Sequence, residues 1–333
     1  MALAAHTLSP ADAAMLSALA DESDGDPGDP GFHDRAWPLA DRLPGQLRRL
    51  LTDFRRAESA EACLVQGFPV AEETAGPTPR HWETAASVTT TRRAEVLLSL
   101  CGAVLGDPFS WATLQSGRMV QNILPIPGDE KQQNGHGSEA LLEFHTEDGF
   151  HPDRCDYLLL LGVRNHDLVP TLLSSVRDVV LGDRTRKVLA EPRFHILPDG
   201  EHLRQLAERA PDGPALTEAR ALYEQPPAVP VLFGDRLNPY LRIDRPFMRC
   251  APGDTEAEEA LDALMAELHR VRREVVVSTG SLLVLDNYLA VHGRKAFPAR
   301  YDGTDRWLKK LTVRRDLRRL ERARAAENRR VLY

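Results

Sequence analysis

Cysteine, excess positive charge and long apolar runs are all scarce in this chain of 333 residues. The four cysteines include no C-x-x-C pair, which argues against a metal site built from thiolates. The formal net charge of −7 offers nothing that would attract a nucleic acid or an anionic membrane. The longest uninterrupted apolar runs, such as residues 157–161, are far too short to span a bilayer.

Signals for export and for nucleotide binding are lacking as well. The first residues, MALAAHTLSPADAAML, contain no basic segment, and Asp12 interrupts the apolar stretch, so they do not have the pattern of a signal peptide. We therefore expect a reducing, cytoplasmic location. The chain has no G-x-G-x-x-G or P-loop sequence, and its strands do not alternate regularly with helices, which argues against a doubly wound parallel sheet.

The chain does contain many short apolar segments that are typical of strands, together with a few clear helix signals. Hydrophobic residues make up 42% of it, enough for a substantial core. Ser9-Pro10 is typical of a helix start, residues 89–105 have one apolar helical face, and Thr255-x-x-Glu258 is a capping box that opens another helix. Strands are expected at 116–126, 140–144, 157–163, 229–233, 240–243, 274–278, 281–285 and 307–314. Short strands with helices on the outside favour a sheet sandwich or a jelly roll that carries helices.

A long polar segment precedes one of these strands. Residues 125–140, PIPGDEKQQNGHGSEA, contain glycine and show neither a helical nor a strand period. Loops of this length inside a compact domain are often lids over a functional site. Residues 128–138 are therefore expected to form a mobile lid that excludes water when it closes.

Histidine and glutamate gather at the end of the strand expected at 140–144, in the sequence EFHTEDGFHPDRCD. Side chains two residues apart in a strand point to the same side, so His145 and Glu147 are expected to project together. His151 lies further on, where the strand has ended. A third metal ligand must then come from a neighbouring strand, and His292 in LDNYLAVHGRKAF is the candidate.

Two imidazoles and one carboxylate on one face leave three positions of an octahedral metal open, which suits non-haem Fe(II) with a cosubstrate and O₂. Zinc suits the set less well, because the chain has no H-E-x-x-H motif. With 11 histidines, an H-x-E triplet arises by chance fairly often, so the triplet alone favours an ordinary surface. Arg306, in YDGTDRWLKKL, changes this balance, because an enzyme that uses 2-oxoglutarate needs a buried cation for its far carboxylate.

Two stretches, HTEDGFHP and DN-x-x-x-VHGR-x-x-F-x-x-RYDGTDRWL, resemble the clavaminate synthase-like family of Fe(II)/2-oxoglutarate oxygenases. The likeness is greatest to hydroxylases that act on free arginine or asparagine in peptide-antibiotic pathways, and it is strongest over residues 116–163 and 229–315. It implies a single oxygenase domain over residues 1–333. It also implies a mainly β fold with flanking helices and a double-stranded β-helix (jelly-roll) core.

The resemblance implies roles for individual residues. His145, Glu147 and His292 resemble the iron ligands of the family, and Arg306 resembles the residue that anchors 2-oxoglutarate. Glu147 argues against a halogenase, whose pattern has a small residue in place of the metal carboxylate. Glu147 and Arg306 together argue against an alternative from another class, a jelly-roll binding protein with a vestigial site.

The residues that the resemblance implies for the amino-acid substrate match less completely. Gln121 stands at a family position near the amino group of the substrate, and Glu147 can face that amine as well. Four residues past Arg306, the arginine hydroxylases have an arginine that holds the substrate carboxylate. This chain has Lys310 there, a point charge without the bidentate fork of arginine.

Acidic residues for a basic substrate side chain are fewer than the resemblance implies. In GDRLNPYLRID, Asp235 and Asp244 are expected to meet a cationic side chain, although Asp235 beside Gly234 is equally typical of a turn. Asn238 and Tyr240 stand where further acids were expected. The sequence thus predicts hydroxylation, at the β carbon, of a free L-amino acid such as arginine or a related basic or polar residue. Asparagine, lysine and a carrier-bound amino acid remain alternative substrates.

Overall fold

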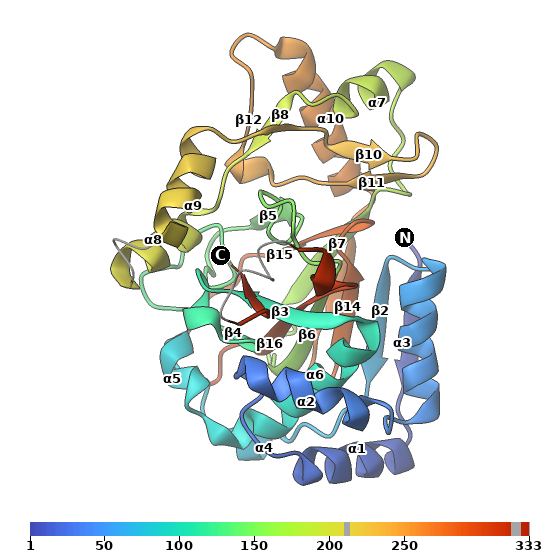
Figure 1. The fold of residues 1–333 in the computed structure, drawn as a ribbon, viewed down its shortest axis with the longest axis vertical. Coiled ribbons are helices and arrows are strands. Elements are labelled where there is room, and N and C mark those ends of the chain that lie inside the picture. Colours follow the sequence, from blue (N-terminus) through green and yellow to red (C-terminus); the bar gives the residue numbers. More distant parts are fainter. Residues whose placement is uncertain (210–213, 321–327, 333) are drawn as a thin grey trace.

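The computed structural model describes residues 1–209, 214–320 and 328–332, which form two facing sheets with helices on the outside (Figure 1). Helices from the first third of the chain, coloured blue to cyan, lie along the outer side of the larger sheet. A region of helices and short strands, coloured yellow to orange, lies at the other end of the molecule. The chain is therefore a mixture of helix and sheet, with a larger helical share than its sequence predicted.

The larger sheet has the strand order β1–β2–β14–β6–β16–β3–β17, with β4 also paired to β16. These strands are β1 (Leu3–Thr7), β2 (Ala62–Gln66), β3 (Asp107–Trp111), β4 (Gln121–Ile123), β6 (Tyr157–Arg164), β14 (Leu282–Asp286), β16 (Trp307–Arg314) and β17 (Val331–Leu332). The central strand β6 is buried along its whole length, because alternate leucines enter apolar clusters on opposite faces of the sheet. Burial on both faces explains why residues 157–161 show no polar alternation.

The smaller sheet has the order β13–β7–β15–β5 and is antiparallel throughout. Its strands are β5 (Leu142–His145), β7 (Pro170–Ser175), β13 (Arg273–Val276) and β15 (Ala290–Arg294). Leu160 and Leu308 of the larger sheet share an apolar cluster with Leu173 and Val275 of the smaller one. The two sheets therefore pack face to face, and their polar ends enclose the pocket described below.

The helices lie outside the two facing sheets. They are α1 (Pro10–Glu22), α2 (Pro30–Ala40), α3 (Gly45–Ala57), α4 (Glu72–Ala75), α5 (Trp82–Ala86), α6 (Arg92–Leu105), α7 (Asp183–Leu189), α8 (Gly200–Arg209), α9 (Pro214–Glu224) and α10 (Thr255–Arg270). Short 3₁₀ turns are η1 (Thr89–Thr91), η2 (Gln115–Gly117), η3 (Arg245–Phe247) and η4 (Leu317–Arg319). Helices α1, α2, α3 and α6 share one apolar cluster with the outer face of the larger sheet.

The region at the far end is built from small sheets and the remaining helices. The hairpin β10 (Leu232–Gly234) and β11 (Pro239–Leu241) forms one sheet, and β12 (Met248–Cys250), β8 (Phe194–Ile196) and β9 (Ala228–Val229) form another. Apolar residues of α7 and α10 pack with these strands in a second large cluster that also contains Phe144 of β5. This region therefore packs against the strand that carries His145.

Two predicted element boundaries are corrected by the structure. The helix expected to begin with a capping box at Thr255 is capped one residue earlier, because the Asp254 carboxylate accepts the N–H of Ala257 at 3.1 Å. The strand expected at 116–126 is only Gln121–Ile123, since the chain turns through η2 just before it. By contrast, Ser9 caps α1 as predicted, with Asp12 completing a capping box.

None of the helices in the described part of the chain combines the length and apolar character that a bilayer crossing requires.

Asp286, the last residue of β14, is a buried carboxylate that we expect to cost stability at neutral pH. Its Oδ1 accepts the N–H groups of Tyr288 and Leu289 at 2.9 and 3.2 Å, but burial outweighs these bonds and raises its pKa to about 6 from 3.8. Because this pKa is raised in the folded state, the folded protein binds the proton more tightly than the unfolded chain does. The free energy of unfolding therefore falls as pH rises from about 4 to about 6 and stays lowered above that.

Asp286→Asn keeps the acceptor for both N–H groups and removes the titration. Urea unfolding at pH 7.5 is expected to show the variant more stable than the parent by on the order of 2–3 kcal/mol, with the difference vanishing near pH 4. Equal urea midpoints at pH 7.5 would show that this carboxylate is not destabilising.

Candidate active site

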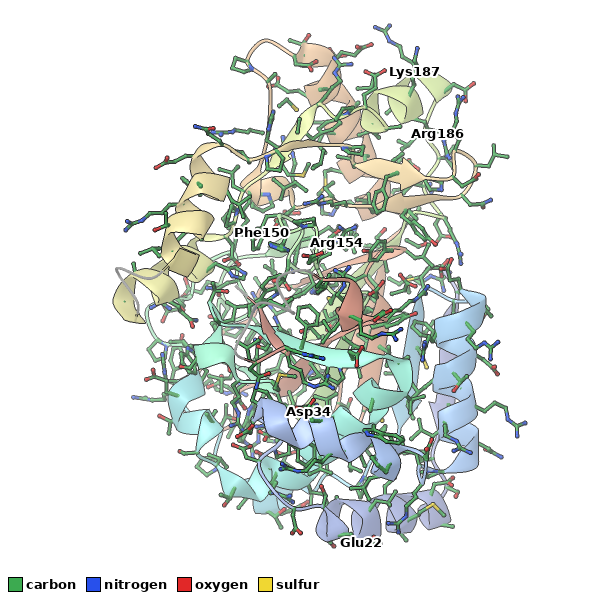
Figure 2. All side chains as sticks on the ribbon, in the orientation of Figure 1. Glu22, Asp34, Phe150, Arg154, Arg186 and Lys187 are labelled. Carbon is green, nitrogen blue, oxygen red and sulfur yellow. The ribbon has the colours of Figure 1, made fainter. Side chains whose placement is uncertain are left out.

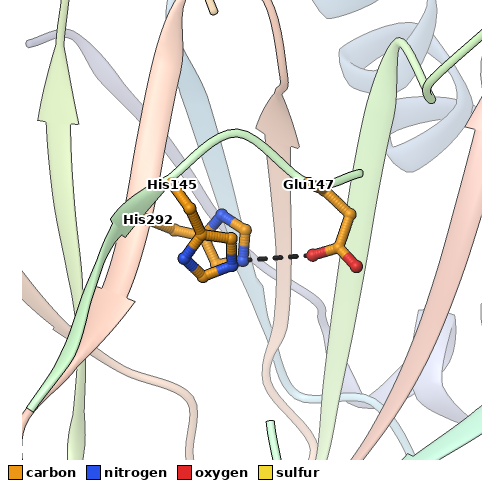
Figure 3. A group of neighbouring side chains, drawn as sticks. All are labelled: His145, Glu147 and His292. Carbon is orange, nitrogen blue, oxygen red and sulfur yellow. Dashed lines mark ion pairs between the residues drawn. The ribbon is translucent and has the colours of Figure 1, made fainter. Parts of the chain in front are cut away.

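His145, Glu147 and His292 come together where β5 ends beside β15 (Figure 3). In the pairing of these two strands, His145 and His292 are direct partners. Thr146 points away, as predicted for the residue between two ligands, and its hydroxyl accepts the N–H of Ile243 at 3.1 Å. Thr146 therefore binds the backbone of Ile243 on the side away from the pocket, while the side chains of His145 and Glu147 face the pocket.

The backbone of Glu147 is held by Asn287, which follows β14. The Asn287 Oδ1 accepts the Glu147 N–H at 2.9 Å, and its Nδ2 donates to the Glu147 carbonyl at 3.1 Å. The same Nδ2 lies 3.0 Å from the carbonyl of Cys155. These hydrogen bonds from Asn287 hold the backbone of Glu147 in place beyond the end of β5, where strand pairing no longer holds it.

The three side chains are close enough to bind one ion. Their potential ligand atoms all lie within 4.8 Å of one another. The Nε2 of His292 is 3.3 Å from a carboxylate oxygen of Glu147, and the two imidazole rings have centroids 4.2 Å apart. The Nδ1 of His145 is 2.9 Å from the carbonyl of Glu143, so its Nε2 is the nitrogen that remains for a metal.

The electrostatics of the site favour the protonation states that bind metals. Burial, together with a smaller contribution from the neighbouring His292, lowers the pKa of His145 to about 3. Burial would raise the pKa of Glu147, but Lys310 and His292 outweigh it and hold that pKa well below its usual range. A neutral imidazole beside an ionised carboxylate is the form in which these residues act as ligands.

One end of the pocket is cationic. Arg306, just before β16, is buried, and its guanidinium contacts the Thr171 hydroxyl at 3.4 Å. Arg294 lines the same end, and neither guanidinium forms an ion pair with any carboxylate in the part of the chain described here. Burial and then the charge of Arg294 lower the pKa of Arg306. An anion bound here would offset both effects.

Gln121 and Lys310 line the pocket next to the three clustered residues. They are direct partners in the pairing of β4 with β16, which sets them side by side. Lys310 donates through its ammonium to Glu147, and Gln121 lies 3.2 Å from the Ser110 hydroxyl. Arg306, Leu308 and Lys310 all face the pocket, as the two-residue period of a strand predicts.

Of the two aspartates proposed from the sequence, only Asp244 lies at the pocket. It forms a bridge with the backbone of His145 and lines the wall beyond it. The prediction that Asp235 lies at the pocket is corrected by the structure. Asp235 lies in the exposed turn between β10 and β11, where its carboxylate accepts the N–H groups of Leu237 and Asn238, each at 2.8 Å. Its side chain stabilises that turn and does not line the pocket.

Two further acids and a histidine line the pocket that were not found from the sequence. Asp148 adopts a positive φ of 51° directly after Glu147, and its carboxylate accepts the Trp111 indole N–H at 2.6 Å. Asp199 and His202 come from the start of α8, and the His202 Nε2 is 3.5 Å from Asp148. A sequence signal existed only for Asp148, which is adjacent to a proposed ligand.

Burial sets Asp244 apart within this acidic wall. Burial raises its pKa well above the usual value, and the charges of Asp199, Glu147 and Asp148 raise it further. Lys310 pairs with Glu147, and His202 lies beside Asp148. The pocket is therefore lined by two arginines near Thr171 and by acidic residues next to the candidate metal ligands.

The segment 128–138, which the sequence predicts to be a lid, borders the pocket. Its residues Gln133, Asn134, Gly135 and His136 contribute to the wall. Gln133 holds the approach to β5, because its side chain donates to the Leu141 carbonyl at 2.7 Å and accepts the Glu143 N–H at 3.1 Å. His151 instead stacks edge-on against Trp111, with centroids 4.6 Å apart, and is not part of the metal cluster.

Comparison with known proteins gives close relatives along nearly the whole chain. The chain is 41% identical over 304 residues to enduracididine beta-hydroxylase of Streptomyces hygroscopicus, covering 88% of each chain. It is 38% identical over 299 residues to L-ornithine/L-arginine 3-hydroxylase of Catenulispora acidiphila, covering 87% of each. The structure of the non-haem iron oxygenase OrfP with Fe, succinate and (3S)-hydroxy-L-Arg matches with a TM-score of 0.92 at 39% identity, covering 99% of both chains. No family model matches the chain.

Proposed function

The chain belongs to the clavaminate synthase-like family of non-haem Fe(II)/2-oxoglutarate oxygenases, and from that premise we propose that it hydroxylates the β carbon of a free L-amino acid with a basic side chain, arginine first. The single observation that carries this proposal is the polarity of the pocket. Two arginines line it near Thr171, and aspartates line it next to Glu147 and His145 of the candidate metal cluster. Such a pocket suits an anionic cosubstrate on one side and a cationic amino acid on the other.

His145, Glu147 and His292 would hold the iron. The donor set fits, since two imidazoles and an ionised carboxylate on one face leave positions open for further ligands. Arg306 would hold the far carboxylate of 2-oxoglutarate, because it is a buried guanidinium with no carboxylate partner among the described residues. When bound, iron with 2-oxoglutarate and O₂ supplies the oxidant that replaces a C–H with C–OH, and the cosubstrate leaves as succinate and CO₂.

The chain's own residues position the amino acid. Lys310 would pair with the α-carboxylate, and Gln121 with Glu147 would receive the α-ammonium group. Anchoring both groups next to the candidate iron ligands would leave the β carbon on the side of the metal cluster and direct the side chain towards the acidic wall. Pre-positioning of this kind is the main contribution that a protein makes when a cofactor carries out the oxidation.

The acidic wall favours a basic side chain over a neutral one. Asp244 is a buried carboxylate whose pKa is raised by burial and by neighbouring acids, so a cation bound beside it would remove an unfavourable interaction. Asp148 and Asp199 line the same wall. A neutral side chain such as that of asparagine would bring no positive charge to these acids.

We propose three further features of the chain. The two facing sheets would form the double-stranded β-helix of the family, within one domain spanning residues 1–333. Residues 128–138 would act as a mobile lid, which their place along the pocket supports. All four cysteines are free thiols, which supports a reducing, cytoplasmic location.

The direct test is a screen of free amino acids with Fe(II), 2-oxoglutarate and O₂, followed by mass spectrometry of the products. We expect arginine or a close basic relative to be consumed with a mass gain of one oxygen atom, with succinate formed in equal amount. Asparagine and a carrier-bound aminoacyl group are the comparison substrates. Preference for either of them over every free basic amino acid would contradict the proposal.

Lys310 provides a prediction specific to the substrate. Lys310→Met is expected to raise the KM for the amino acid about thirtyfold or more, because it removes one partner of a buried charge pair with the substrate carboxylate. The KM for 2-oxoglutarate should change little. Lys310→Arg keeps a cation at this position and should restore most of the affinity.

Because Lys310 also contacts Glu147, the iron content of each variant must be measured. We expect one iron per chain in both variants. If Lys310→Met instead loses iron while keeping its KM for the amino acid, Lys310 serves Glu147 and not the substrate.

A further inference from the structure

Arg294 lies two residues past His292 on β15, at the cationic end of the pocket. It is a buried arginine, 3% exposed, with no ion-pair partner in the part of the chain that the structure describes. Its pairing partner on β7 is Thr171, the same residue whose hydroxyl contacts Arg306. Thr171 is therefore a neighbour of both arginines, of Arg294 through strand pairing and of Arg306 through its hydroxyl, and both arginines line the pocket.

Two buried cations at one place repel each other unless an anion lies between them or beside them. Burial of a charge without a partner is strongly unfavourable, so an anionic ligand is the natural complement of this pair. A carboxylate offers about four acceptor positions, more than one guanidinium can fill. The Nε atoms of both Arg294 and Arg306 are buried without an acceptor among the described residues, which leaves donors available on each.

Arg294 also binds the backbone at the end of the lid segment 128–138 and just after it. Its NH1 donates to the carbonyl of Gly137, and its NH2 to the carbonyl of Ala140 at 3.2 Å. Its guanidinium lies 5.0 Å from the centroid of the Phe297 ring, and the Phe297 N–H donates to the carbonyl of Ser138 at 2.8 Å. Residues 137–140, which are the last two residues of the lid and the two that follow it, are therefore attached to the strand that carries Arg294 and to the loop after it.

The beginning of the lid is attached to the loop that leads to Arg306. The Tyr301 hydroxyl donates to the Glu130 carboxylate at 2.8 Å, and that carboxylate accepts the N–H of Gly128 at 3.0 Å. The Tyr301 N–H in turn donates to Asp305 at 2.6 Å, and Asp305 directly precedes Arg306. Each end of segment 128–138 is thus connected to one of the two arginines by a short series of hydrogen bonds.

We propose that Arg294 is a positioning residue of the cosubstrate site, whose guanidinium joins the far carboxylate of 2-oxoglutarate to the lid end at Gly137 and Ala140. The inference rests on the proposed function in assigning Arg306 to that carboxylate. Cosubstrate binding then orders residues 128–138, so that the pocket closes only when the co-reactant is present. Arg306 binds the far carboxylate of 2-oxoglutarate. Arg294 contacts both that carboxylate and the lid, so the lid becomes ordered when 2-oxoglutarate is bound.

The test follows amide hydrogen exchange of peptides covering residues 128–140 in the Fe(II)-loaded enzyme without O₂, with and without saturating 2-oxoglutarate. In the parent enzyme we expect the cosubstrate to slow exchange in this segment about tenfold or more. Arg294→Met should lose that slowing, and its Kd for 2-oxoglutarate should rise about tenfold. Arg294→Lys keeps a cation but not the planar fork, so its Kd should stay within about threefold while the slowing is lost.

The matched control is Arg154→Met. Arg154 is also a buried arginine, but it stacks on Tyr288 at 4.4 Å and does not line the pocket; Figure 2 places it where the far region meets the sheets. It should keep both the Kd and the slowing of exchange. Parent-like slowing in both Arg294 variants, or no slowing in a parent enzyme that binds 2-oxoglutarate through Arg306, would overturn the inference alone. A parent enzyme that does not bind 2-oxoglutarate would overturn the proposed function and this inference together.

Discussion

Removing His292 is expected to abolish both iron binding and hydroxylation. His292→Ala leaves two ligand side chains, of which Glu147 can then satisfy its charge through Lys310 alone. Loss of an outer partner of a metal ligand already costs roughly 10–100-fold in affinity or activity, so loss of a ligand should cost at least about a thousandfold in kcat/KM. Metal analysis after anaerobic reconstitution should fall from one iron per chain to a small fraction.

His151 offers the matched control for this experiment. It is a buried histidine a few residues from Glu147, but it packs on Trp111 and is not part of the cluster. His151→Ala should therefore retain iron, whatever its thermal stability. A His292→Ala variant that is folded by circular dichroism and still binds a full equivalent of iron would remove His292 from the site.

The core of the site was predictable because its geometry is local. In β5, the two-residue period of a strand places His145 and Glu147 together and turns Thr146 away, and the structure has this arrangement. His292 was a candidate from its sequence context and from the family resemblance, but nothing in the spacing of residues 145 and 292 indicates that β5 and β15 are neighbours. The pairing of these strands is a long-range property of the sheet.

The acidic end of the pocket shows where prediction from sequence stops. Asp235 and Asp244 lie in one short segment, and either could have faced the pocket. The hairpin β10–β11 decides between them, because it sends Asp235 into an exposed turn and returns the chain so that Asp244 meets His145. Asp199 was not expected, since its place depends on how the start of α8 packs over the pocket.

Two adjacent lysines in β16 show the same difference between what local strand geometry predicts and what depends on long-range packing. Lys310 faces the pocket, whereas Lys309 faces the helices and forms a buried ion pair of 2.7 Å with Glu95 of α6. The alternation of a strand predicts that the two point in opposite directions, and the position of Arg306 four residues before Lys310 indicates which one points inward. The partner of Lys309 could not be predicted, because it depends on α6 packing across the sheet.

Replacing Arg306 is expected to remove 2-oxoglutarate binding while sparing the iron. Arg306→Met substitutes an uncharged side chain of similar length, so the cavity stays filled while the far carboxylate loses its partner. Breaking a buried charge pair in this way typically costs about 3–5 kcal/mol, a hundredfold or more in affinity. Calorimetric titration of the Fe(II) enzyme without O₂ should show this rise in the Kd for 2-oxoglutarate.

Iron content should not change in Arg306→Met, because the one side-chain hydrogen bond of Arg306 among the described residues is to the hydroxyl of Thr171 and not to a candidate ligand. Arg154→Met, a loss of charge at a buried position outside the pocket, should leave the Kd for 2-oxoglutarate unchanged. Turnover of Arg306→Met at very high 2-oxoglutarate should approach that of the parent, since the defect lies in cosubstrate affinity. A parent-like Kd in Arg306→Met would move the anchor to another residue, of which Arg294 is the nearest cation at this end of the pocket.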